Sequence, residues 1–305
     1  MNNPVMKAWI HALRLRTLPL SIAGIVCGSF YAIHTGHWNG SIFTLALSTT
    51  LLFQILSNLA NDLGDSMKGA DNENRIGPTR AVQSGLISKA QMKFAVILTS
   101  ALSILSALAL IYVSRDQLNQ QLILFYGFLA LACVIAAITY TVGKKAYGYH
   151  GLGDVFVFLF FGFVSVMGVY PLFSGEEPTD LIWPAITIGS FSSAVLNLNN
   201  MRDFENDAAV GKRTLVVKMG LQKAKTHHSG LIIIGMASWV YFLIYTEQWW
   251  AFISCLPFML LLKHLAFVWK NNTPKAFDPH LKIVALSTFF VSLLFALGTL
   301  LNAWN

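Results

Sequence analysis

The chain has 305 residues, of which 55% are hydrophobic and only 11% are charged, and its mean hydropathy is +0.59. Because soluble domains carry about 25% charged residues, this composition excludes a soluble globular enzyme, and the predominance of apolar residues excludes a disordered or fibrous chain. The net charge of +7 does not indicate nucleic-acid binding, since the basic residues lie in short loops between apolar runs. We therefore predict an all-α, polytopic membrane protein that contacts the lipid bilayer and no nucleic acid, with a single domain over residues 1–305.

Nine apolar stretches approach the roughly 20 residues that a membrane-crossing helix needs. In chain order they are Leu18–Ala32, Ile42–Asn58, Phe94–Val113, Leu122–Val142, Val155–Phe173, Ile182–Leu198, Leu231–Tyr245, Trp249–Phe267 and Ile283–Leu301. The first stretch follows basic residues, as in a secretory signal peptide, but we see no convincing cleavage site and further spans follow. We therefore interpret it as a retained helix.

The distribution of basic residues predicts the orientation of the chain. With nine spans, alternate loops lie on opposite sides of the membrane, which places 20 of the 21 lysines and arginines on one side and only Arg115 on the other. Cytoplasmic loops carry such an excess of Lys and Arg. We predict that the N-terminus is cytoplasmic and that the C-terminus lies on the opposite side.

Two similar clusters of Asn and Asp lie at the cytoplasmic ends of the second and sixth predicted spans. The first holds Asn58, Asp62 and Asp65, and the second holds Asn199, Asp203 and Asp207. At 100° per residue, the first three fall at about 0°, 40° and −20° around a helix, and the second three at about 0°, 40° and 80°. Each cluster therefore presents one polar face, and each begins with an amide four residues before an Asp.

The chemistry of these clusters favours a divalent cation. Carboxylates at a membrane boundary are costly unless they are paired, hydrated or bound to metal, and several on one helical face repel one another. Oxygen ligands without thiolates suit Mg²⁺, which binds a few carboxylates together with water and substrate phosphates. With basic residues nearby, the clusters predict a magnesium–diphosphate site. Solvated helix ends capped by Asp and Asn, or a pathway for a transported cation, are alternative interpretations.

The paired spacing Asn58-xxx-Asp62-xx-Asp65 and Asn199-xxx-Asp203-xxx-Asp207 resembles the two aspartate-rich motifs of the UbiA superfamily of intramembrane prenyltransferases. Further segments resemble its menaquinone-type branch, the 1,4-dihydroxy-2-naphthoate polyprenyltransferases. These segments are Arg14–Pro19, Asn61–Asp71, Arg75–Pro78, Tyr140–Lys144, Gly151–Asp154 and Gly211–Val216. The similarity covers the chain to about residue 220, and the last three spans are unspecific apolar sequence.

The resemblance implies a fold and a reaction. The fold is nine transmembrane helices around a central cavity, with both motifs on the cytoplasmic side. In the reaction, a polyprenyl diphosphate ionises to an allylic cation and Mg²⁺-bound diphosphate. The ring of 1,4-dihydroxy-2-naphthoate then attacks the cation, and loss of the carboxylate gives demethylmenaquinone. An apolar bundle suits this chemistry, since it accommodates an isoprenoid tail and excludes the water that would trap the cation.

By motif position, the resemblance implies that Mg²⁺ is held, directly or through water, by Asn58, Asp62, Asp65, Asn199, Asp203 and Asp207. Candidate contacts to the diphosphate or to the acceptor carboxylate are Arg75, Arg80, Lys144, Lys145, Arg202 and Lys212, although cytoplasmic-side charge alone also explains each of them. Arg202 is favoured because it adjoins Asp203, and Lys144 because it completes a Tyr140-xxx-Lys144 spacing similar to one in the superfamily. Asp71 either orders its loop or contacts the acceptor. Tyr140 either faces the cation through its ring or lies in the interfacial aromatic belt.

Three other functions compete with this interpretation. The same fold could act on another acceptor, such as 4-hydroxybenzoate, haem or a chlorophyll precursor. A cation-coupled transporter should show internal symmetry, whereas nine spans divide poorly into halves. A non-catalytic quinone or lipid binder would keep its function when the aspartates are replaced.

The eight histidines, among them His227, His228 and His264, lie outside these motifs. We expect His227 and His228 to be solvated in a cytoplasmic loop, and His264, at the end of a span, to contact lipid headgroups.

Overall fold

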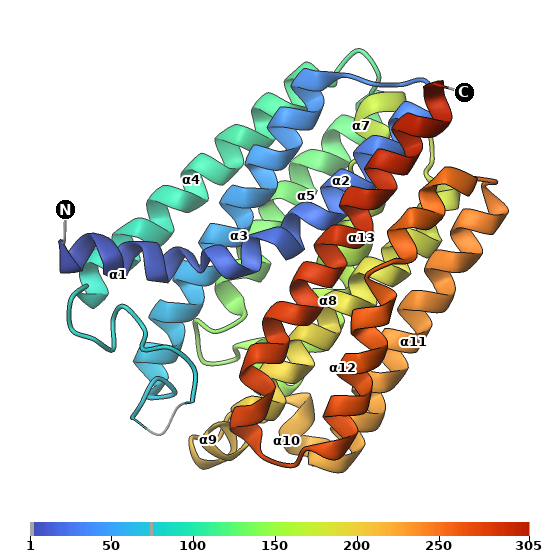
Figure 1. Cartoon of the computed structure of the whole chain (residues 1–305). Coiled ribbons are helices and arrows are strands. Elements are labelled where there is room, and N and C mark those ends of the chain that lie inside the picture. The colour runs from blue at the N-terminus through green and yellow to red at the C-terminus, as the bar shows by residue number, and fades with distance from the viewer. Residues whose placement is uncertain (1–2, 74–75, 305) are drawn as a thin grey trace.

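The structure, a computed structural model, describes residues 3–73 and 76–304, and within them the chain is helical with no strand. The predicted all-α class is therefore confirmed. The main helices (Figure 1) are α1 (Pro4–Leu13), α2 (Leu18–His34), α3 (Gly40–Lys68), α4 (Lys89–Val113), α5 (Gln120–Thr139), α6 (Gly153–Val157), α7 (Pro171–Ser174), α8 (Ile182–Arg202), α9 (Phe204–Ala209), α10 (Leu215–Met219), α11 (Leu221–Tyr245), α12 (Phe258–Lys270) and α13 (Asp278–Trp304). Short 3₁₀ segments are η1 (Leu15–Thr17), η2 (Tyr147–His150), η4 (Thr179–Leu181), η5 (Trp249–Cys255) and η6 (Pro274–Phe277), and η3 (Phe158–Met167) is a π-helix.

The number of membrane spans agrees with the sequence. Among the described residues, eight helical segments are long and apolar enough to cross a bilayer, and the bent pair α1 and α2 adds a ninth. The two helices of that pair meet at 42°. The first span thus begins where predicted, at Leu18, but a short helix that was not predicted precedes it. The chain is a multi-pass membrane protein.

Helix α3 is longer than the apolar stretch that predicted it. It begins after Asn39, whose side chain accepts hydrogen bonds from the backbone of Ser41 and Ile42, and it ends at Lys68, just before Gly69, which has φ of +72°. A glycine adopts this left-handed conformation at little cost, so it stops the helix cleanly. The first Asn/Asp cluster therefore lies within a continuous helix, as the predicted polar face requires.

The fifth span contains the π-helix, which lies close to α8. A Cβ added at Gly162 of the π-helix would lie 2.4 Å from the carbonyl oxygen of Ala185 and 3.0 Å from Cα of Gly189. Only glycine permits this approach of the two backbones. The contact fixes α8, which carries the second cluster, against the fifth span.

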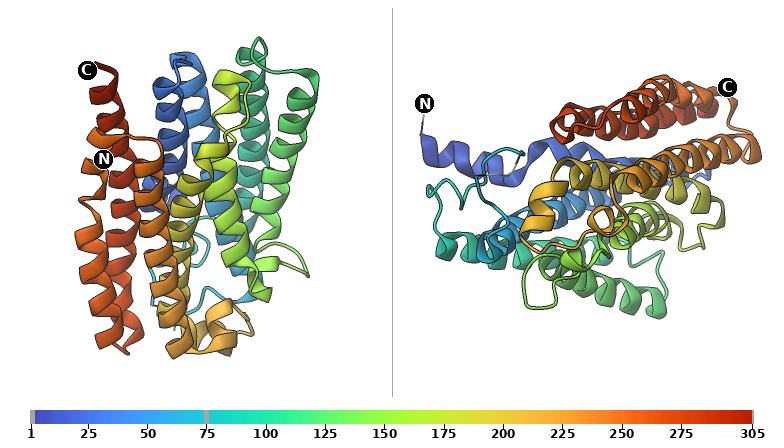
Figure 2. Two further views of the ribbon diagram at one scale, coloured as in Figure 1. Left: turned by 90° about the vertical axis from the view of Figure 1, so that its right-hand side faces the viewer. Right: turned by 90° about the horizontal axis from the view of Figure 1, so that it is seen from below.

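The last helix closes the bundle. Helix α13 packs against both α2 and α8, which brings the start of the fold and its end together (Figure 2). Helices α9 and α10 lie at one end of the bundle, and the C-terminus lies at the other end (Figure 1). The second motif region and the C-terminus therefore lie at opposite ends of the bundle.

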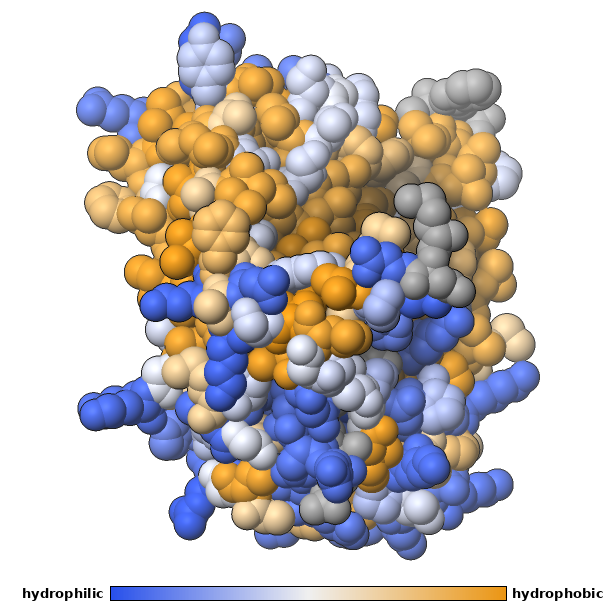
Figure 3. Space-filling view, turned by 90° about the vertical axis from the view of Figure 1, so that its left-hand side faces the viewer, coloured by the Kyte–Doolittle hydropathy of each residue, from blue (hydrophilic) through white to orange (hydrophobic). Residues whose placement is uncertain are grey.

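The surface matches a membrane environment. Large apolar side chains such as Phe94, Phe128 and Met259 are more than 60% exposed, at 67%, 71% and 63%. Hydrophilic side chains gather mainly over the lower part of the molecule in Figure 3, where residues 76–88 precede α4, and apolar side chains cover most of the upper part. In water this exposure would favour aggregation, whereas in a bilayer it faces lipid.

Candidate active site

A cavity of about 640 Å³ lies between the helices. Its lining follows α3 from Ala46 to Asp65, which is about 28 Å at a rise of about 1.5 Å per residue. Toward the ends of α3 and α8 the lining is polar and includes Asn58, Asn61, Asp65, Asn199, Asn200, Asp203, Arg80 and Lys212. Along α4, α5 and the fifth span it is mostly apolar, with Leu110, Ile111, Leu129, Phe156, Phe160, Phe161 and Val164. The structure thus brings two members of each sequence cluster to one end of an elongated apolar cavity, whereas Asp62 and Asp207 lie outside its lining.

Asp62 lies on α3 and is 1% exposed. Its Oδ2 accepts a hydrogen bond of 3.2 Å from the backbone N–H of Ala81. Its Oδ1 is buried without a hydrogen-bond partner among the described residues. A buried carboxylate oxygen without a partner is costly, and a cation is the ligand that would relieve that cost.

Asp65 is held by a tyrosine that lies outside both aspartate clusters. The hydroxyl of Tyr149 donates a hydrogen bond of 2.8 Å to Oδ1 of Asp65. Nζ of Lys68 lies 3.9 Å from the centre of the Tyr149 ring, and Nζ of Lys212 lies 5.4 Å from it. Burial raises the pKa of Tyr149, and the adjacent Asp65 carboxylate raises it further. The phenol therefore stays protonated and acts as a donor to Asp65.

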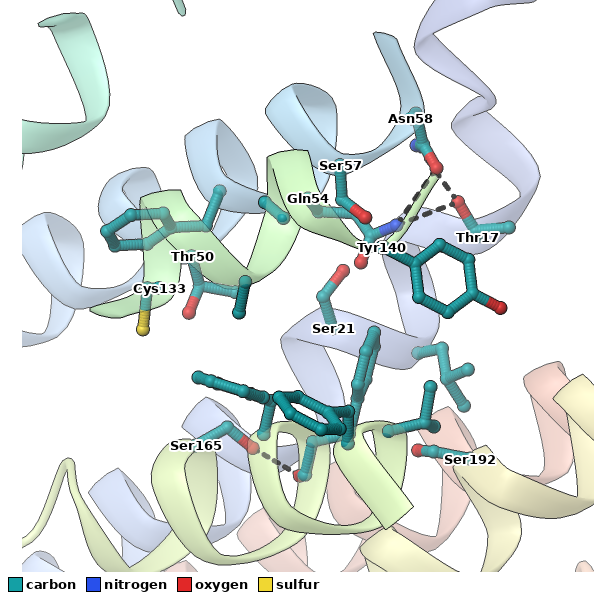
Figure 4. Close-up of a pocket in the computed structure, with 18 of the residues that line it drawn as sticks. Thr17, Ser21, Thr50, Gln54, Ser57, Asn58, Cys133, Tyr140, Ser165 and Ser192 are labelled. Carbon is teal, nitrogen blue, oxygen red and sulfur yellow. Dashed lines mark hydrogen bonds between the residues drawn. The ribbon is translucent and has the colours of Figure 1, made fainter. Parts of the chain in front are cut away.

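The Asn58 amide contacts the N-terminal segment of the chain (Figure 4). Its Nδ2 donates to the carbonyl of Leu13 at 2.9 Å and to Oγ1 of Thr17 at 3.3 Å, and its Oδ1 accepts from Gln54 at 3.1 Å. These bonds attach the junction between α1 and α2 to α3 beside the cavity. The metal role that the resemblance implies for Asn58 stays a prediction, and the observed contacts stabilise the wall.

The second cluster is arranged around a buried arginine. Arg202 is 0% exposed. Its Nε and Nη2 donate to Oδ1 and Oδ2 of Asp203 at 2.9 and 2.6 Å, and Nη2 also donates to Oδ1 of Asn199 at 2.9 Å. Its Nη1 donates to Oδ1 of Asp278, at the start of α13, at 2.6 Å. In this structure the guanidinium contacts protein side chains on every edge.

Helix α8 ends at Arg202 and α9 begins at Phe204, so the second cluster does not form one continuous helix. The backbone bonds nevertheless keep the helical pattern across the break, because Asp203 N–H bonds to Asn199 and Asp207 N–H bonds to Asp203, at 3.0 and 2.8 Å. The cluster therefore keeps a shared face, although the chain direction changes at Asp203.

Loop contacts join the two motif regions. The Nδ2 of Asn206 donates to the carbonyl of Ala70 at 3.1 Å. Nζ of Lys212 lies 3.7 Å from Oδ1 of Asp207, and Nε of Arg80 lies 3.5 Å from Oδ1 of Asp71. The segment after α3 therefore lies against α9. The contact with Arg80 agrees with the loop-ordering role considered for Asp71.

The basic residues predicted to contact the diphosphate or the acceptor differ in whether they line the cavity. Arg80 and Lys212 line the cavity, whereas Lys144 and Lys145 are exposed and lie outside its lining. Arg75 lies outside the described residues. Two basic residues that were not among the candidates, Arg14 and Lys282, also line the cavity.

Tyr140 faces the cavity rather than lipid headgroups. It lines the cavity wall (Figure 4), and its ring packs edge-on against Tyr147, with 5.2 Å between ring centres. Burial raises the pKa of Tyr140, and the nearby Asp154 carboxylate raises it further. Of the two placements left open from the sequence, the structure therefore favours the inward one.

Two of the three expectations for histidines were wrong, because His228 and His264 are buried instead of facing water or lipid headgroups. His228 is 0% exposed and His264 is 1% exposed. Their Nε2 atoms lie 2.7 Å apart, and Nδ1 of His264 lies 2.8 Å from Nδ1 of His280. The reason is that α11 begins at Leu221, ten residues before the predicted span, and carries His228 into the helix packing. Only His227 is half-exposed, with its Nε2 3.7 Å from Oδ1 of Asp154.

The donor set is compatible with a hard divalent cation. The side chains at the polar end present carboxylate and amide oxygens, which are ligands that Mg²⁺ prefers. Within residues 3–73 and 76–304, no three His, Cys, Asp or Glu side chains form a preassembled metal site. A cation here would therefore need oxygens from a bound phosphate or from water in addition to the protein, as Mg²⁺ sites commonly do.

Comparison with known proteins supports this picture. Residues 21–294 match the UbiA prenyltransferase family. The chain is 42% identical to the 1,4-dihydroxy-2-naphthoate octaprenyltransferase of Escherichia coli strain K12, over 98% of this chain and 96% of that protein. It is 41% identical to the protein of that description from Haemophilus influenzae, over 99% of this chain and 98% of that protein.

Solved structures agree in fold. A UbiA homologue from Aeropyrum pernix K1 superposes with a TM-score of 0.67 at 15% identity, over 96% of this chain and 98% of that chain. A UbiA homologue from Archaeoglobus fulgidus, bound to DMAPP and Mg²⁺, superposes with a TM-score of 0.55 at 16% identity, over 92% and 98% of the two chains. At these identities the likeness establishes the helical architecture.

Proposed function

Because the chain belongs to the UbiA prenyltransferase family, we propose that it transfers a polyprenyl group from polyprenyl diphosphate to 1,4-dihydroxy-2-naphthoate, with loss of diphosphate and of the acceptor carboxylate, in menaquinone biosynthesis. The whole chain, residues 1–305, serves as one catalytic domain. The observation that carries the proposal is that residues of both clusters, Asn58 and Asp65 from the first and Asn199 and Asp203 from the second, line one end of the same elongated apolar cavity.

The cavity suits both parts of the donor substrate. Its apolar length along α3 accommodates an isoprenoid tail, and its polar end accommodates the diphosphate. Among the described residues, four basic side chains line the cavity, namely Arg14, Arg80, Lys212 and Lys282. Fixed positive charge in a water-poor site stabilises the charge that develops on the departing diphosphate as its C–O bond breaks.

The carboxylate and amide oxygens at the polar end of the cavity fit Mg²⁺ as the cofactor. Asp62 and Asp65 from α3, with Asp203 and Asp207 from the second cluster, would hold the cation, with Asn58 and Asn199 beside them. The bound cation would neutralise the diphosphate and make it a better leaving group. The archaeal neighbour bound to DMAPP and Mg²⁺ supports this choice. So does Oδ1 of Asp62, which lacks a hydrogen-bond partner among the described residues.

The remaining side chains position the reactants. Tyr149 holds Asp65, and Arg202 holds Asp203 and Asn199. Tyr140 places an aromatic ring on the cavity wall, where its face can stabilise an allylic cation. The apolar lining excludes water from that cation, so that the electron-rich ring of the acceptor captures it.

We place this site on the cytoplasmic side of the cell membrane, with the N-terminus on the same side and the C-terminus opposite. The excess of lysine and arginine at this end supports the orientation.

The mass of the product tests the proposal. Purified protein in detergent is incubated with Mg²⁺, a set of prenyl diphosphates, and either 1,4-dihydroxy-2-naphthoate or 4-hydroxybenzoate. We expect a prenylated, decarboxylated naphthoquinol from the first acceptor and no product from the second. Prenylation of 4-hydroxybenzoate alone would assign the chain to another acceptor. The Asp203→Asn variant, which keeps the side-chain shape, serves as the inactive control.

A further inference from the structure

The start of α13 reaches the polar end of the cavity from a part of the chain without a sequence motif. Asp278, Pro279, Leu281 and Lys282 all line the cavity, although they lie more than 70 positions after the second cluster. Helix α13 also packs against α8. The C-terminal helices therefore take part in the site as well as in closing the bundle.

Asp278 is joined to the second cluster through Arg202. Its Oδ1 accepts from Nη1 of Arg202 at 2.6 Å, and the Asp278 side chain is 37% exposed while that of Arg202 is 0% exposed. The same guanidinium spans both oxygens of Asp203 and reaches the amide oxygen of Asn199. One planar group thus connects three acceptors from two helices and the turn between α8 and α9.

The geometry of a guanidinium makes this connection directional. Its donors form a rigid planar fork, so fixing one edge fixes the direction of the others. Asp278 binds the edge that points away from Asp203, and it therefore sets the angle at which Nε and Nη2 meet the Asp203 carboxylate. Without Asp278, the buried guanidinium of Arg202 would keep Asp203 and Asn199 as its partners, and it could rotate toward them.

We propose that Asp278 is a positioning residue for the prenyl diphosphate end of the site: through Arg202 it sets the orientation of Asp203 and Asn199, so that α13 controls the affinity of the site for Mg²⁺ and diphosphate. This proposal rests on the proposed function. It assigns to Arg202 the task of orienting the second cluster, in place of the direct diphosphate contact expected from the sequence. The acceptor's binding does not depend on this contact.

The test compares Asp278→Ala and Asp278→Asn with a matched control at the other end of the bundle. The control is Asp180→Ala, because Oδ2 of Asp180 accepts a bond of the same 2.6 Å length from the hydroxyl of Tyr31. Two readouts are measured for each variant. The first is the Mg²⁺-dependent rise in unfolding temperature caused by geranyl diphosphate, which needs no turnover. The second is the KM for prenyl diphosphate and for 1,4-dihydroxy-2-naphthoate.

We expect Asp278→Ala to raise the half-saturating concentrations of Mg²⁺ and of prenyl diphosphate by about 10-fold, because Arg202, the outer contact to Asp203 and Asn199, loses its fixed orientation. The KM for the naphthoate should stay within about two-fold of the wild type. Asp278→Asn keeps the shape and an acceptor oxygen but loses the charge, so its effect should be intermediate. Asp180→Ala should lower the unfolding temperature without changing either half-saturation.

Unchanged half-saturation for Mg²⁺ and geranyl diphosphate in both Asp278 variants would overturn the proposal, and so would an equal rise in the KM of both substrates. Should Asp278→Ala fail to fold, Asp278→Asn decides the matter. Failure of the proposed function is recognised separately. In that case the wild-type protein makes no naphthoate product, while the thermal shift with Mg²⁺ and geranyl diphosphate still reports the effect of Asp278.

Discussion

The hydroxyl of Tyr149 donates a hydrogen bond to the carboxylate of Asp65, which precedes it by 84 positions in the chain. The tyrosine ring also lies beside the ammonium groups of Lys68 and Lys212. A single side chain outside both aspartate motifs therefore contacts residues beside each of them. Because the loop that follows α5 supplies Tyr149, this loop is part of the polar end of the site.

Replacement of Tyr149 by phenylalanine tests that role. The Tyr149→Phe variant keeps the ring between the two lysines but removes the donor to Asp65, so we expect kcat/KM for prenyl diphosphate to fall by about 10- to 100-fold. Tyr147→Phe is the control, because within the described part of the chain the hydroxyl of Tyr147 donates to the backbone carbonyl of Ala136 and to no carboxylate. Steady-state kinetics with radiolabelled prenyl diphosphate measure the effect. Equal losses in both variants would contradict a specific role for Tyr149.

The raised pKa of Tyr149 predicts how stability depends on pH. Burial and Asp65 raise this pKa above its usual value of about 10, so the folded protein retains a proton that the unfolded chain releases. The stabilisation is present below pH of about 10 and is lost as the pH rises toward the folded pKa, by up to about 1.4 kcal/mol per pH unit. We expect Tyr149→Phe to lose less unfolding free energy than the wild type between about pH 9 and 11, as measured by urea unfolding in detergent. An identical slope in both proteins would refute the assignment.

Neutralising a motif aspartate should abolish turnover without unfolding the protein. Asp62→Asn removes the charge of a buried carboxylate whose Oδ1 lacks a hydrogen-bond partner among the described residues, so we expect at least about a 100-fold loss in kcat. Asp116→Asn is the matched control, because the Asp116 side chain is 81% exposed in the loop between α4 and α5. Its rate should equal that of the wild type. Size-exclusion chromatography checks that both variants are folded. A wild-type rate in Asp62→Asn would show that Asp62 is not a metal ligand.

Removal of divalent cations should weaken donor binding more than acceptor binding. The carboxylates at the polar end repel the diphosphate unless a cation lies between them. We therefore expect EDTA to eliminate the thermal stabilisation by geranyl diphosphate and added Mg²⁺ to restore it. Binding of the naphthoate, measured in the same assay, serves as the internal comparison. Stabilisation by geranyl diphosphate that persists in EDTA would contradict a metal-dependent site.

The close approach of α8 to the π-helix predicts a difference between two glycines. Gly162→Ala places a methyl group 2.4 Å from the Ala185 carbonyl oxygen, so the backbones must separate and we expect a loss of about 1–3 kcal/mol in unfolding free energy. Gly127→Ala, on α5, meets nothing within 4 Å and should be neutral or stabilising, because alanine favours helix over glycine. Thermal unfolding in one detergent compares the two. A stable Gly162→Ala variant would show that the two helices are not closely packed.

Local patterns in the sequence predicted much of the fold. Apolar runs predicted the spans because a bilayer requires about 20 such residues in a row, and the spacing of Asn58, Asp62 and Asp65 predicted one polar face because the helical repeat is fixed. The same reasoning placed α3 and α8 as carriers of the clusters, and both line the cavity. It did not predict the π-helix, or the length of α11, since polar residues such as His228 remain helical when neighbouring helices bury them.

The partners of the charged groups depend on contacts between distant segments. Lys144 has a motif-like spacing yet is exposed, whereas Arg14 and Lys282, at opposite ends of the chain, both line the cavity. Asp278 has no neighbouring acidic residue to mark it, and only the packing of α13 on α8 brings it to Arg202. The amino-acid sequence by itself determined which segments cross the membrane and which faces are polar, because both follow from local periodicity. The tertiary structure decided which side chains meet at the site, because hydrogen bonds and ion pairs form over about 3 Å between residues whose separation along the chain carries no information about their distance in space.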